Sequence, residues 1–223
     1  MQANKLANLK SVVKGLTPPY AVRAAKKIID ICTISVENDN LLFDGSDEVF
    51  KKLVSQARVY FEYGCGQSTI WVSHNTQAKI YSVDTSKEWL QNTKEKQGAD
   101  NQANLQWVDC GTIGERGRPI NYNQRDNFKS YILGPFGITT ESPDLILVDG
   151  RFRVACFLSS LSKAKQGTSI IFDDYKDTPY YHIAEEFCPN PYFCGRQAIF
   201  TVPDIIDQEL IDPEIDKFNY VFG

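Results

Sequence analysis

Apolar residues follow two different spacings along this chain, and the change falls near residue 57. Before it, they recur at the three- and four-residue intervals of amphipathic helices, over about 20–32 and again over about 47–56. Ser46 is the expected N-cap of the second helix, and the acidic residues after it suit the positive end of the helix dipole. These spacings predict two helices that pack on the rest of the chain.

From residue 58 onward, short apolar runs alternate with helical stretches. This alternation is typical of a parallel sheet with helices on both faces, because strands covered on both faces are almost continuously apolar. The expected strands are 59–62, 80–83, 105–108, 145–148, 169–172, 195–202 and 218–222. The expected helices between them are 68–74, 88–97 and 151–164. We therefore predict an α/β domain over 58–223, with the helical segment 1–57 packed on its core as part of a single globular unit.

The segment 111–142 breaks this alternation. It is rich in Gly, Asn, Arg and aromatic residues and has no clear period. Connections of this length in compact domains are usually lids or binding loops. We therefore expect this segment to cover the functional site and to select the ligand.

One short motif carries the strongest chemical signal, and it lies at 59–69 with the sequence VYFEYGCGQST. An apolar strand ends in Glu62, and Gly64 and Gly66 then allow a tight turn that approaches a ligand, before a helix whose first N–H groups are free. Ser68 replaces the third glycine of the dinucleotide-binding fingerprint. Glu62 would also repel a pyrophosphate and attract an ammonium group. The motif thus favours a cationic ligand over a dinucleotide.

This motif resembles the first motif of class I S-adenosylmethionine-dependent methyltransferases, Glu/Asp-x-Gly-x-Gly. The form Glu-Tyr-Gly-x-Gly-x-Ser-Thr is similar to a poorly characterised branch of that class, and the resemblance extends over about 58–200. It implies a Rossmann-like, doubly wound α/β fold with a mostly parallel seven-stranded sheet. It also implies that S-adenosylmethionine lies across the carboxyl ends of the first strands, bound by Glu62, Gly64, Gly66 and Ser68.

Acids also end the next two expected strands. Asp84 follows the glycines by roughly 20 residues, where a carboxylate can accept hydrogen bonds from both ribose hydroxyls. Trp89 could form a wall of the nucleoside site or pack in the core. The resemblance places Asp109 at the adenine amino group, but Asp109 could equally be a turn residue that caps Gly111.

Three further acids, Asp149, Asp173 and Asp174, end the fourth and fifth expected strands. Neighbouring parallel strands end in one crevice, so these carboxylates should converge there. Such a cluster needs protons or a hard cation to relieve its repulsion, and oxygen ligands suit Mg²⁺ or another divalent cation. It resembles the metal site of metal-dependent O-methyltransferases. Asp149 could also be the general base of a metal-free mechanism.

Arginines and one histidine accompany the acids. Where some of those methyltransferases have a lysine or histidine, this chain has Arg151 and Arg153, which are too strongly protonated to act as bases. Arg151 would instead anchor an anionic or hydroxylated substrate. Pairing of both arginines with the acids, and capping of the following helix by Asp174, is the alternative. His182 is a candidate base, although a lone histidine is more often structural.

Composition narrows the class of protein further. With 223 residues, 42% of them hydrophobic, the chain can bury one substantial core. A net charge of −4 disfavours nucleic-acid binding. No window approaches the roughly 20 apolar residues that cross a bilayer, and the first 15 residues lack the apolar stretch of a signal peptide. We expect a cytoplasmic protein with a small-molecule substrate, and the oligomeric state stays open.

These observations lead to one expected function and two alternatives. We expect an S-adenosylmethionine-dependent methyltransferase that O-methylates a small hydroxylated or sugar-like acceptor. An NAD(P)-dependent oxidoreductase would use the same strand, turn and acid, but this chain lacks the third glycine of the dinucleotide-binding fingerprint. A non-catalytic nucleoside-binding module would keep the pocket without the chemistry, because a fold does not fix a function.

Overall fold

The computed structural model of the protein describes residues 41–223, which lie within one compact unit, Asn40–Gly223. The helix expected over 20–32 lies outside the described residues. The second expected helix is observed as α3, Glu48–Gln56. Its N-cap is Asp47 rather than the expected Ser46, and the Asp47 carboxylate accepts hydrogen bonds from the backbone N–H groups of Leu42 and Phe43.

Within the described residues, seven strands form one sheet in the order β3-β2-β1-β4-β5-β7-β6. Their bounds are β1 Val59–Tyr63, β2 Lys79–Asp84, β3 Asn104–Trp107, β4 Leu145–Val148, β5 Ser169–Phe172, β6 Tyr192–Cys194 and β7 Gln197–Thr201. The first five strands are parallel, while β7 runs antiparallel to β5 and β6 runs antiparallel to β7. The predicted mostly parallel, seven-stranded Rossmann-like sheet is confirmed.

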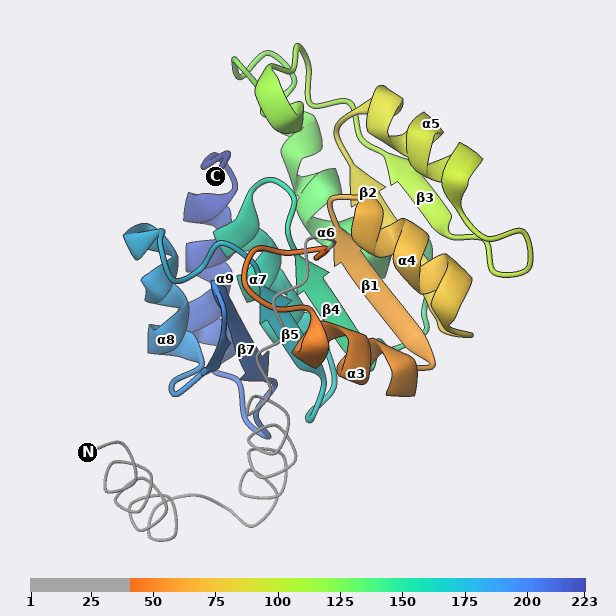
Figure 1. Ribbon diagram of the computed structural model, residues 1–223. Helices are drawn as coiled ribbons and strands as arrows, with labels where there is room; N and C mark the ends of the chain where they lie inside the picture. Colours follow the sequence, from red (N-terminus) through yellow and green to blue (C-terminus); the bar gives the residue numbers. More distant parts are fainter. Residues whose placement is uncertain (1–40) are drawn as a thin grey trace, which may run out of the picture. The chain divides into compact units, whose positions relative to one another are not determined.

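Helices cover both faces of this sheet (Figure 1). The remaining α-helices are α4 Gln67–Asn75, α5 Lys87–Lys96, α6 Phe128–Ile138, α7 Arg153–Lys163, α8 Ala184–Phe187 and α9 Gln208–Phe218. Figure 1 shows α3, α4 and α5 on one face and α6, α7 and α9 on the other. None of the described helices is long and apolar enough to span a membrane.

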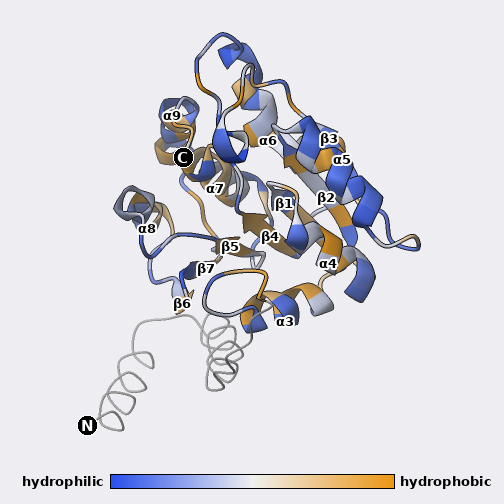
Figure 2. Cartoon of the chain, turned by 45° about the horizontal axis from the view of Figure 1, so that its top comes forward, coloured by the Kyte–Doolittle hydropathy of each residue, from blue (hydrophilic) through white to orange (hydrophobic). Residues whose placement is uncertain are grey.

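The central strands are apolar because both of their faces are covered. All five residues of β1 and all four of β4 are buried. Figure 2 shows hydrophobic residues concentrated on β1, β4 and β5, and a largely hydrophilic α5. Helix α3 adds Phe50, whose ring packs edge-on against Tyr60 of β1 with the centroids 5.9 Å apart. The division of the chain at residue 57 stays a prediction.

The strand expected at 218–222 is wrong. The aromatic residues at every second position suggested a strand, but α9 extends to Phe218 and the chain then continues without regular structure. The Phe222 ring instead packs against Phe128 and Phe152, at centroid distances of 5.5 and 5.7 Å. The seventh strand is β6, which sequence reasoning missed.

The segment 111–142 is not one long irregular connection. It contains α6, which is broken at Gly134, where φ is 29°. A Cβ atom at Gly134 would lie 2.8 Å from Val83 Cγ1 and 2.9 Å from Tyr63 Cε1, so this helix approaches β1 and β2 more closely than a larger residue allows. The part before α6, 111–127, holds only two short 3-10 helices, Glu115–Gly117 and Arg125–Asn127, and its role as a lid stays a prediction.

Candidate active site

A cavity of about 660 Å³ opens at the carboxyl ends of the strands, which is the usual place for ligands in open α/β sheets. Its volume is in the range of small-molecule sites. The predicted site residues that line it are Gly64, Gly66, Ser68, Asp84, Asp149, Arg151 and Asp174. Those that do not line it are Glu62, Asp109, Asp173 and His182.

The glycine turn after β1 forms one wall of the cavity. Gly64 has φ of +92°, and a Cβ atom there would lie 2.7 Å from Gly150 Cα, so the turns after β1 and β4 can meet only if this residue is glycine. At Gly66 an added Cβ atom would meet nothing within 4 Å. The turn therefore leaves open space beside the N-terminus of α4.

Glu62 lies behind this turn instead of facing the cavity. It is fully buried, and its two carboxylate oxygens accept hydrogen bonds from the hydroxyl groups of Ser68 and Thr69 at the start of α4. Burial raises the pKa of Glu62 to about 7, and the two hydroxyl groups oppose this shift. Glu62 thus fixes α4 relative to β1. Its predicted contact with the cofactor stays a prediction.

Asp84 is placed to bind a pair of hydroxyl groups. Its Oδ2 accepts a hydrogen bond from Cys65 N at 3.0 Å and its Oδ1 accepts one from Ser86 N at 2.7 Å, so each oxygen keeps a lone pair. Burial raises the pKa of Asp84, and these backbone donors lower it. Trp89, in the first turn of α5, also lines the cavity and is 45% exposed. This exposure argues against core packing for Trp89.

Asp109 and His182 lie outside the cavity lining. Asp109 Oδ1 accepts a hydrogen bond from Gly111 N at 3.0 Å, which is the alternative role in a turn. The His182 ring packs on Tyr175 with the centroids 5.0 Å apart, and its Nε2 lies 3.1 Å from Tyr175 O. The structure therefore does not bring His182 to the acids at the ends of β4 and β5.

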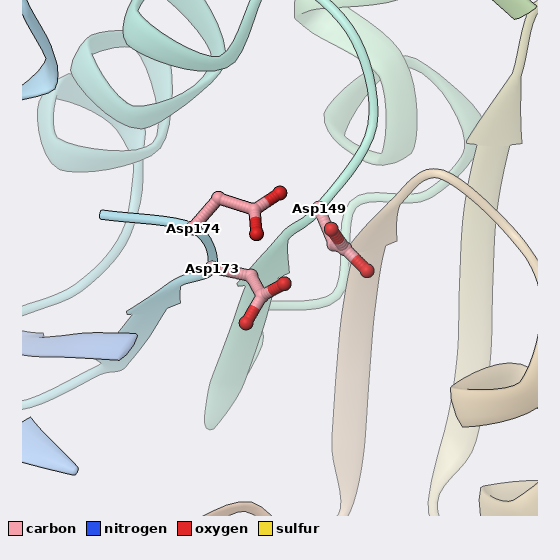
Figure 3. Close-up of side chains that lie close together, drawn as sticks. All are labelled: Asp149, Asp173 and Asp174. Carbon is pink, nitrogen blue, oxygen red and sulfur yellow. The ribbon is translucent and has the colours of Figure 1, made fainter. Parts of the chain in front are cut away.

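Asp149, Asp173 and Asp174 do converge, as Figure 3 shows. One carboxylate oxygen from each lies within 4.8 Å of the others. Asp149 and Asp174 face the cavity, while Asp173 is buried beneath them. Convergence at one crevice was predicted from the ends of two neighbouring strands, β4 and β5, and it is confirmed.

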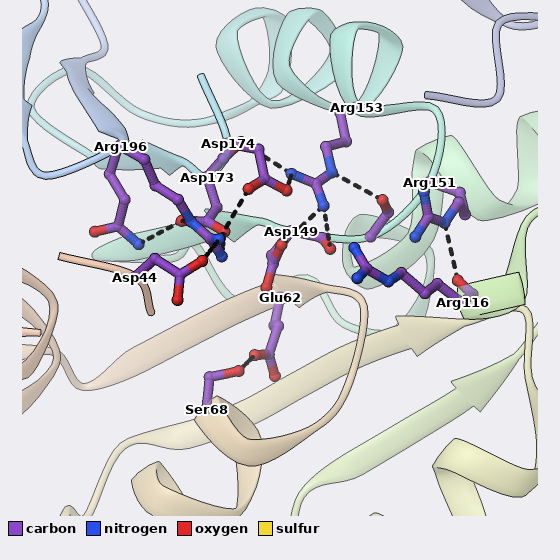
Figure 4. A network of polar contacts seen from close by, with 12 residues as sticks. Asp44, Glu62, Ser68, Arg116, Asp149, Arg151, Arg153, Asp173, Asp174 and Arg196 are labelled. Carbon is purple, nitrogen blue, oxygen red and sulfur yellow. Dashed lines mark hydrogen bonds and ion pairs between the residues drawn. The ribbon is translucent and has the colours of Figure 1, made fainter. Parts of the chain in front are cut away.

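Two arginines hold these three acids together (Figure 4). Arg153, whose side chain is 7% exposed, contacts Asp149 Oδ1 and Asp174 Oδ2, each at 2.9 Å. Arg196 contacts both oxygens of Asp173, at 3.2 and 2.5 Å, and Asp174 Oδ1 at 3.1 Å. Pairing of Arg153 with the acids was the alternative left open above. Arg196, in the turn before β7, is a residue of the site that sequence reasoning missed, because no spacing connects it with β4.

The guanidinium groups occupy the oxygens that a metal ion would need. Mg²⁺ and Ca²⁺ are held by carboxylate oxygens at close range, and here those of Asp173 and Asp174 already face arginine nitrogens. Among the described residues, Asp149 Oδ2 is the one cluster oxygen with no hydrogen bond or ion pair. A divalent ion would also sit beside two fixed positive charges. The residues present do not fit such an ion.

Asp149 is the acid of this cluster that is best placed for chemistry. It follows β4 directly and faces the cavity beside the glycine turn, since Asp149 N donates a hydrogen bond to Tyr63 O at 3.1 Å. Burial raises the pKa of Asp149, Arg153 lowers it, and the neighbouring Asp173 raises it again. A carboxylate whose pKa lies above its usual range accepts a proton more readily near neutral pH.

Three solved structures are similar to this chain. A methyltransferase-like protein from Silicibacter pomeroyi has a TM-score of 0.73 and 26% sequence identity, over 82% of this chain and 97% of that chain. A cofactor-bound protein from MTB has a TM-score of 0.48 and 16% identity, over 89% and 96% of the two chains. An O-methyltransferase from Bacillus cereus in complex with SAH has a TM-score of 0.47 and 16% identity, over 87% and 96%.

Of these three structures, only the first is similar enough to indicate the class of this protein, together with the fold and the site at the strand ends. No protein-family model matches the chain, and no curated protein matches it. The likeness confirms the prediction of a class I methyltransferase, both in the fold and in the class of enzyme.

Proposed function

We propose that the protein is an S-adenosylmethionine-dependent methyltransferase that O-methylates a small hydroxylated or sugar-like acceptor. The observation that supports this best is a single cavity with two chemically different sides. One side offers the glycine turn, Asp84 and an exposed Trp89, and the other offers Asp149 with one unoccupied carboxylate oxygen among the described contacts.

The donor side suits the parts of S-adenosylmethionine. The lone pairs that remain on Asp84 can accept hydrogen bonds from the two ribose hydroxyls. Trp89 offers an open ring face to the adenine. The N-terminus of α4 beside Gly66 offers free N–H groups to the carboxylate of the methionine part. When bound, S-adenosylmethionine supplies an electrophilic methyl group.

On the acceptor side, Asp149 would orient the hydroxyl group and take its proton at Oδ2. The acceptor oxygen forms its new bond to the methyl carbon as the carbon–sulfur bond breaks, and the proton passes to the carboxylate. Arg153 holds Oδ1 of the same carboxylate at 2.9 Å, so the free oxygen has a fixed direction. Positioning of this kind can supply much of the catalysis of a methyl transfer.

We propose that this reaction needs no divalent cation, because Arg153 and Arg196 already neutralise the acids that would bind one. The net charge of −4 supports a small-molecule acceptor over a nucleic acid. A cytoplasmic location and the absence of a membrane partner stay predictions.

Isothermal titration with S-adenosylmethionine, S-adenosylhomocysteine and NAD tests the proposed cofactor. We expect the two adenosyl ligands to bind at one site and NAD not to compete with them. Binding of NAD alone would overturn the proposal in favour of an oxidoreductase. If the adenosyl ligands bind but no hydroxylated compound is ever methylated, the non-catalytic alternative is supported.

A further inference from the structure

We propose that Arg151 binds an anionic group of the acceptor, a carboxylate or a phosphate, so that the substrate is an anionic hydroxylated molecule. This inference rests on the proposed function and specifies its acceptor. Arg151 lines the cavity, has few contacts within the protein, and differs in this from the other arginines around it.

A hydrogen bond of its backbone N–H fixes Arg151 in a turn that lines the cavity. It follows Gly150 in the turn between β4 and α7, and its N–H donates a hydrogen bond to the hydroxyl oxygen of Tyr131 at 3.0 Å. The next residue, Phe152, has φ of +54°, so α7 begins at Arg153 and Arg151 remains in the turn. Arg151 and Arg153 are two residues apart in the sequence, but Arg151 therefore lies in the turn and Arg153 in the helix.

The Arg151 side chain is half-buried, lines the cavity and is anchored at one atom. Its Nε donates a hydrogen bond to Arg116 O at 3.0 Å. No described residue makes a hydrogen bond with its two terminal nitrogens, and no described carboxylate forms an ion pair with it. Burial, and next the positive charge of Arg153, lower the pKa of Arg151, while Tyr131, Tyr181 and Asp149 oppose this shift more weakly. A partly desolvated guanidinium without an anion is unfavourable, and a ligand anion would relieve it.

Arg153 and Arg196, which also line the cavity, are paired with carboxylates of the protein itself. Arg153 contacts Asp149 and Asp174, and Arg196 contacts Asp173 and Asp174. Figure 4 shows these ion pairs on one side and the Arg151 guanidinium on the other, where its one drawn contact is with Arg116. Arg151 is thus the half-buried cation that is left for a ligand.

The cofactor's own carboxylate has a different place. The N-cap Gly66 and the first two residues of α4, Gln67 and Ser68, line the cavity. This nine-residue helix has free N–H groups at its start. A carboxylate bound there leaves Arg151 unpaired. A sulfonium ion in the same cavity adds another positive charge, which an anionic acceptor would balance.

The shape of the guanidinium specifies the partner further. Its two terminal nitrogens form a planar fork that matches two oxygens of a carboxylate or a phosphate. Arg116 supplies a second positive charge at the edge of the cavity, and the loop that carries it is tied to the donor side, because Thr85 Oγ1 donates to Gly117 O at 2.6 Å. This loop thus joins the ribose side of the cavity to Arg151.

The test uses Arg151→Met, Arg151→Lys and the control Arg118→Met, which removes an exposed charge from the same loop. In the first arm, S-adenosylhomocysteine and 5′-methylthioadenosine, which lacks the carboxylate, are titrated into each protein. We expect all variants to bind both ligands within about twofold of the wild type, since other groups hold the cofactor. Selective loss of S-adenosylhomocysteine binding by Arg151→Met would assign Arg151 to the cofactor's carboxylate and overturn the proposal.

In the second arm, the proteins saturated with S-adenosylhomocysteine are titrated with inorganic phosphate, glycerate, glycerol 3-phosphate and neutral glycerol. We expect the wild type and Arg118→Met to bind the anions and not glycerol. Arg151→Met should lose about tenfold or more in affinity, with Arg151→Lys between them, because lysine keeps the charge but lacks the fork. Anion binding that is absent from the wild type, or unchanged in Arg151→Met, would overturn the proposal.

The two arms separate this inference from the proposed function. Failure of the wild type to bind S-adenosylhomocysteine contradicts the proposed function itself. Binding of S-adenosylhomocysteine without binding of anions contradicts only the assignment of Arg151. Thermal melting of each variant shows whether it is folded, and Arg151→Lys keeps the test decisive if Arg151→Met is not.

Discussion

The donor and acceptor sides of the cavity both place carboxylates at the ends of parallel strands, but they compensate those carboxylates differently. On the donor side, Glu62 and Asp84 accept hydrogen bonds from hydroxyl and backbone N–H groups, and no described arginine or lysine pairs with them. On the acceptor side, two arginines form ion pairs with the three acids. A side without internal cations suits a cationic donor. On the other side the acids already have arginine partners, and among the described residues Arg151 is the half-buried cation that is left for a ligand.

Loss of Arg153 should have the largest effect, because it would remove one of the two cations that pair with the acids of the acceptor side. Arg153→Met leaves Asp149 and Asp174 without that partner and frees the carbonyl groups of Gly150 and Asp173. We expect a loss of about 3–5 kcal/mol in the free energy of unfolding, measured by urea denaturation. The control Arg118→Met should change it by no more than about 0.5 kcal/mol. Similar small losses in both variants would contradict the role given to Arg153.

The buried acid of the donor side should make stability depend on pH. Because burial raises the folded-state pKa of Glu62 from 4.5 to about 7, the folded protein holds this proton more tightly than the unfolded chain. The contribution is fully present below about pH 4.5 and is lost as the pH rises through about 7. A shift of this size corresponds to roughly 3 kcal/mol.

The matched variant Glu62→Gln isolates this contribution, since glutamine cannot titrate. We expect the stability of the wild type to fall relative to that of Glu62→Gln between about pH 4.5 and 7. Urea denaturation of both proteins at several pH values measures the difference. Parallel stability curves would show that Glu62 is not the group responsible.

Weakening the donor side at its open end should affect binding more than folding. Asp84→Asn keeps the size of the side chain but loses the charge that strengthens hydrogen bonds from ribose hydroxyls. We expect about a ten- to hundredfold loss in affinity for S-adenosylhomocysteine by isothermal titration. The exposed Asp100→Asn serves as a control that should bind normally. Equal affinity of Asp84→Asn and the wild type would remove Asp84 from the site.

Removal of metal should have the smallest effect. We expect EDTA and Mg²⁺ to leave the melting temperature of the wild type unchanged, because arginines occupy the acids. Arg196→Met frees Asp173 and one oxygen of Asp174, so Mg²⁺ or Ca²⁺ should raise the melting temperature of this variant. A stabilisation of the wild type by Mg²⁺ that Asp174→Asn abolishes would contradict the arginine account.

The parts of the fold that the sequence predicts best are those with unbroken apolar runs. Strands β4 and β5 were predicted to the residue, because runs buried on both faces are hard to mistake. The strand expected at 218–222 failed because aromatic residues at every second position also suit packing against Phe128 and Phe152. Local spacing does not distinguish those two arrangements.

Within the site, the positions of the acids could be predicted from the sequence, but the groups that form hydrogen bonds or ion pairs with them could not. The ends of successive parallel strands indicate where Asp84, Asp149 and Asp174 lie. The sequence does not indicate that Glu62 faces Ser68 beneath the turn, or that Arg196 reaches the acids from the turn before β7, the strand that pairs with β5. Both contacts depend on the tertiary arrangement, and the ion pairs of Arg196 distinguish an arginine-paired cluster from a metal site.

The most direct test of the account is the titration of S-adenosylhomocysteine into wild-type protein in EDTA and again in Mg²⁺. We predict binding at one site, with the same affinity in both solutions. Asp84 and the glycine turn would hold the ligand, and Arg153 and Arg196 take the place of a metal ion beside the acids. Binding that appears only with Mg²⁺, or no binding in either solution, would contradict it.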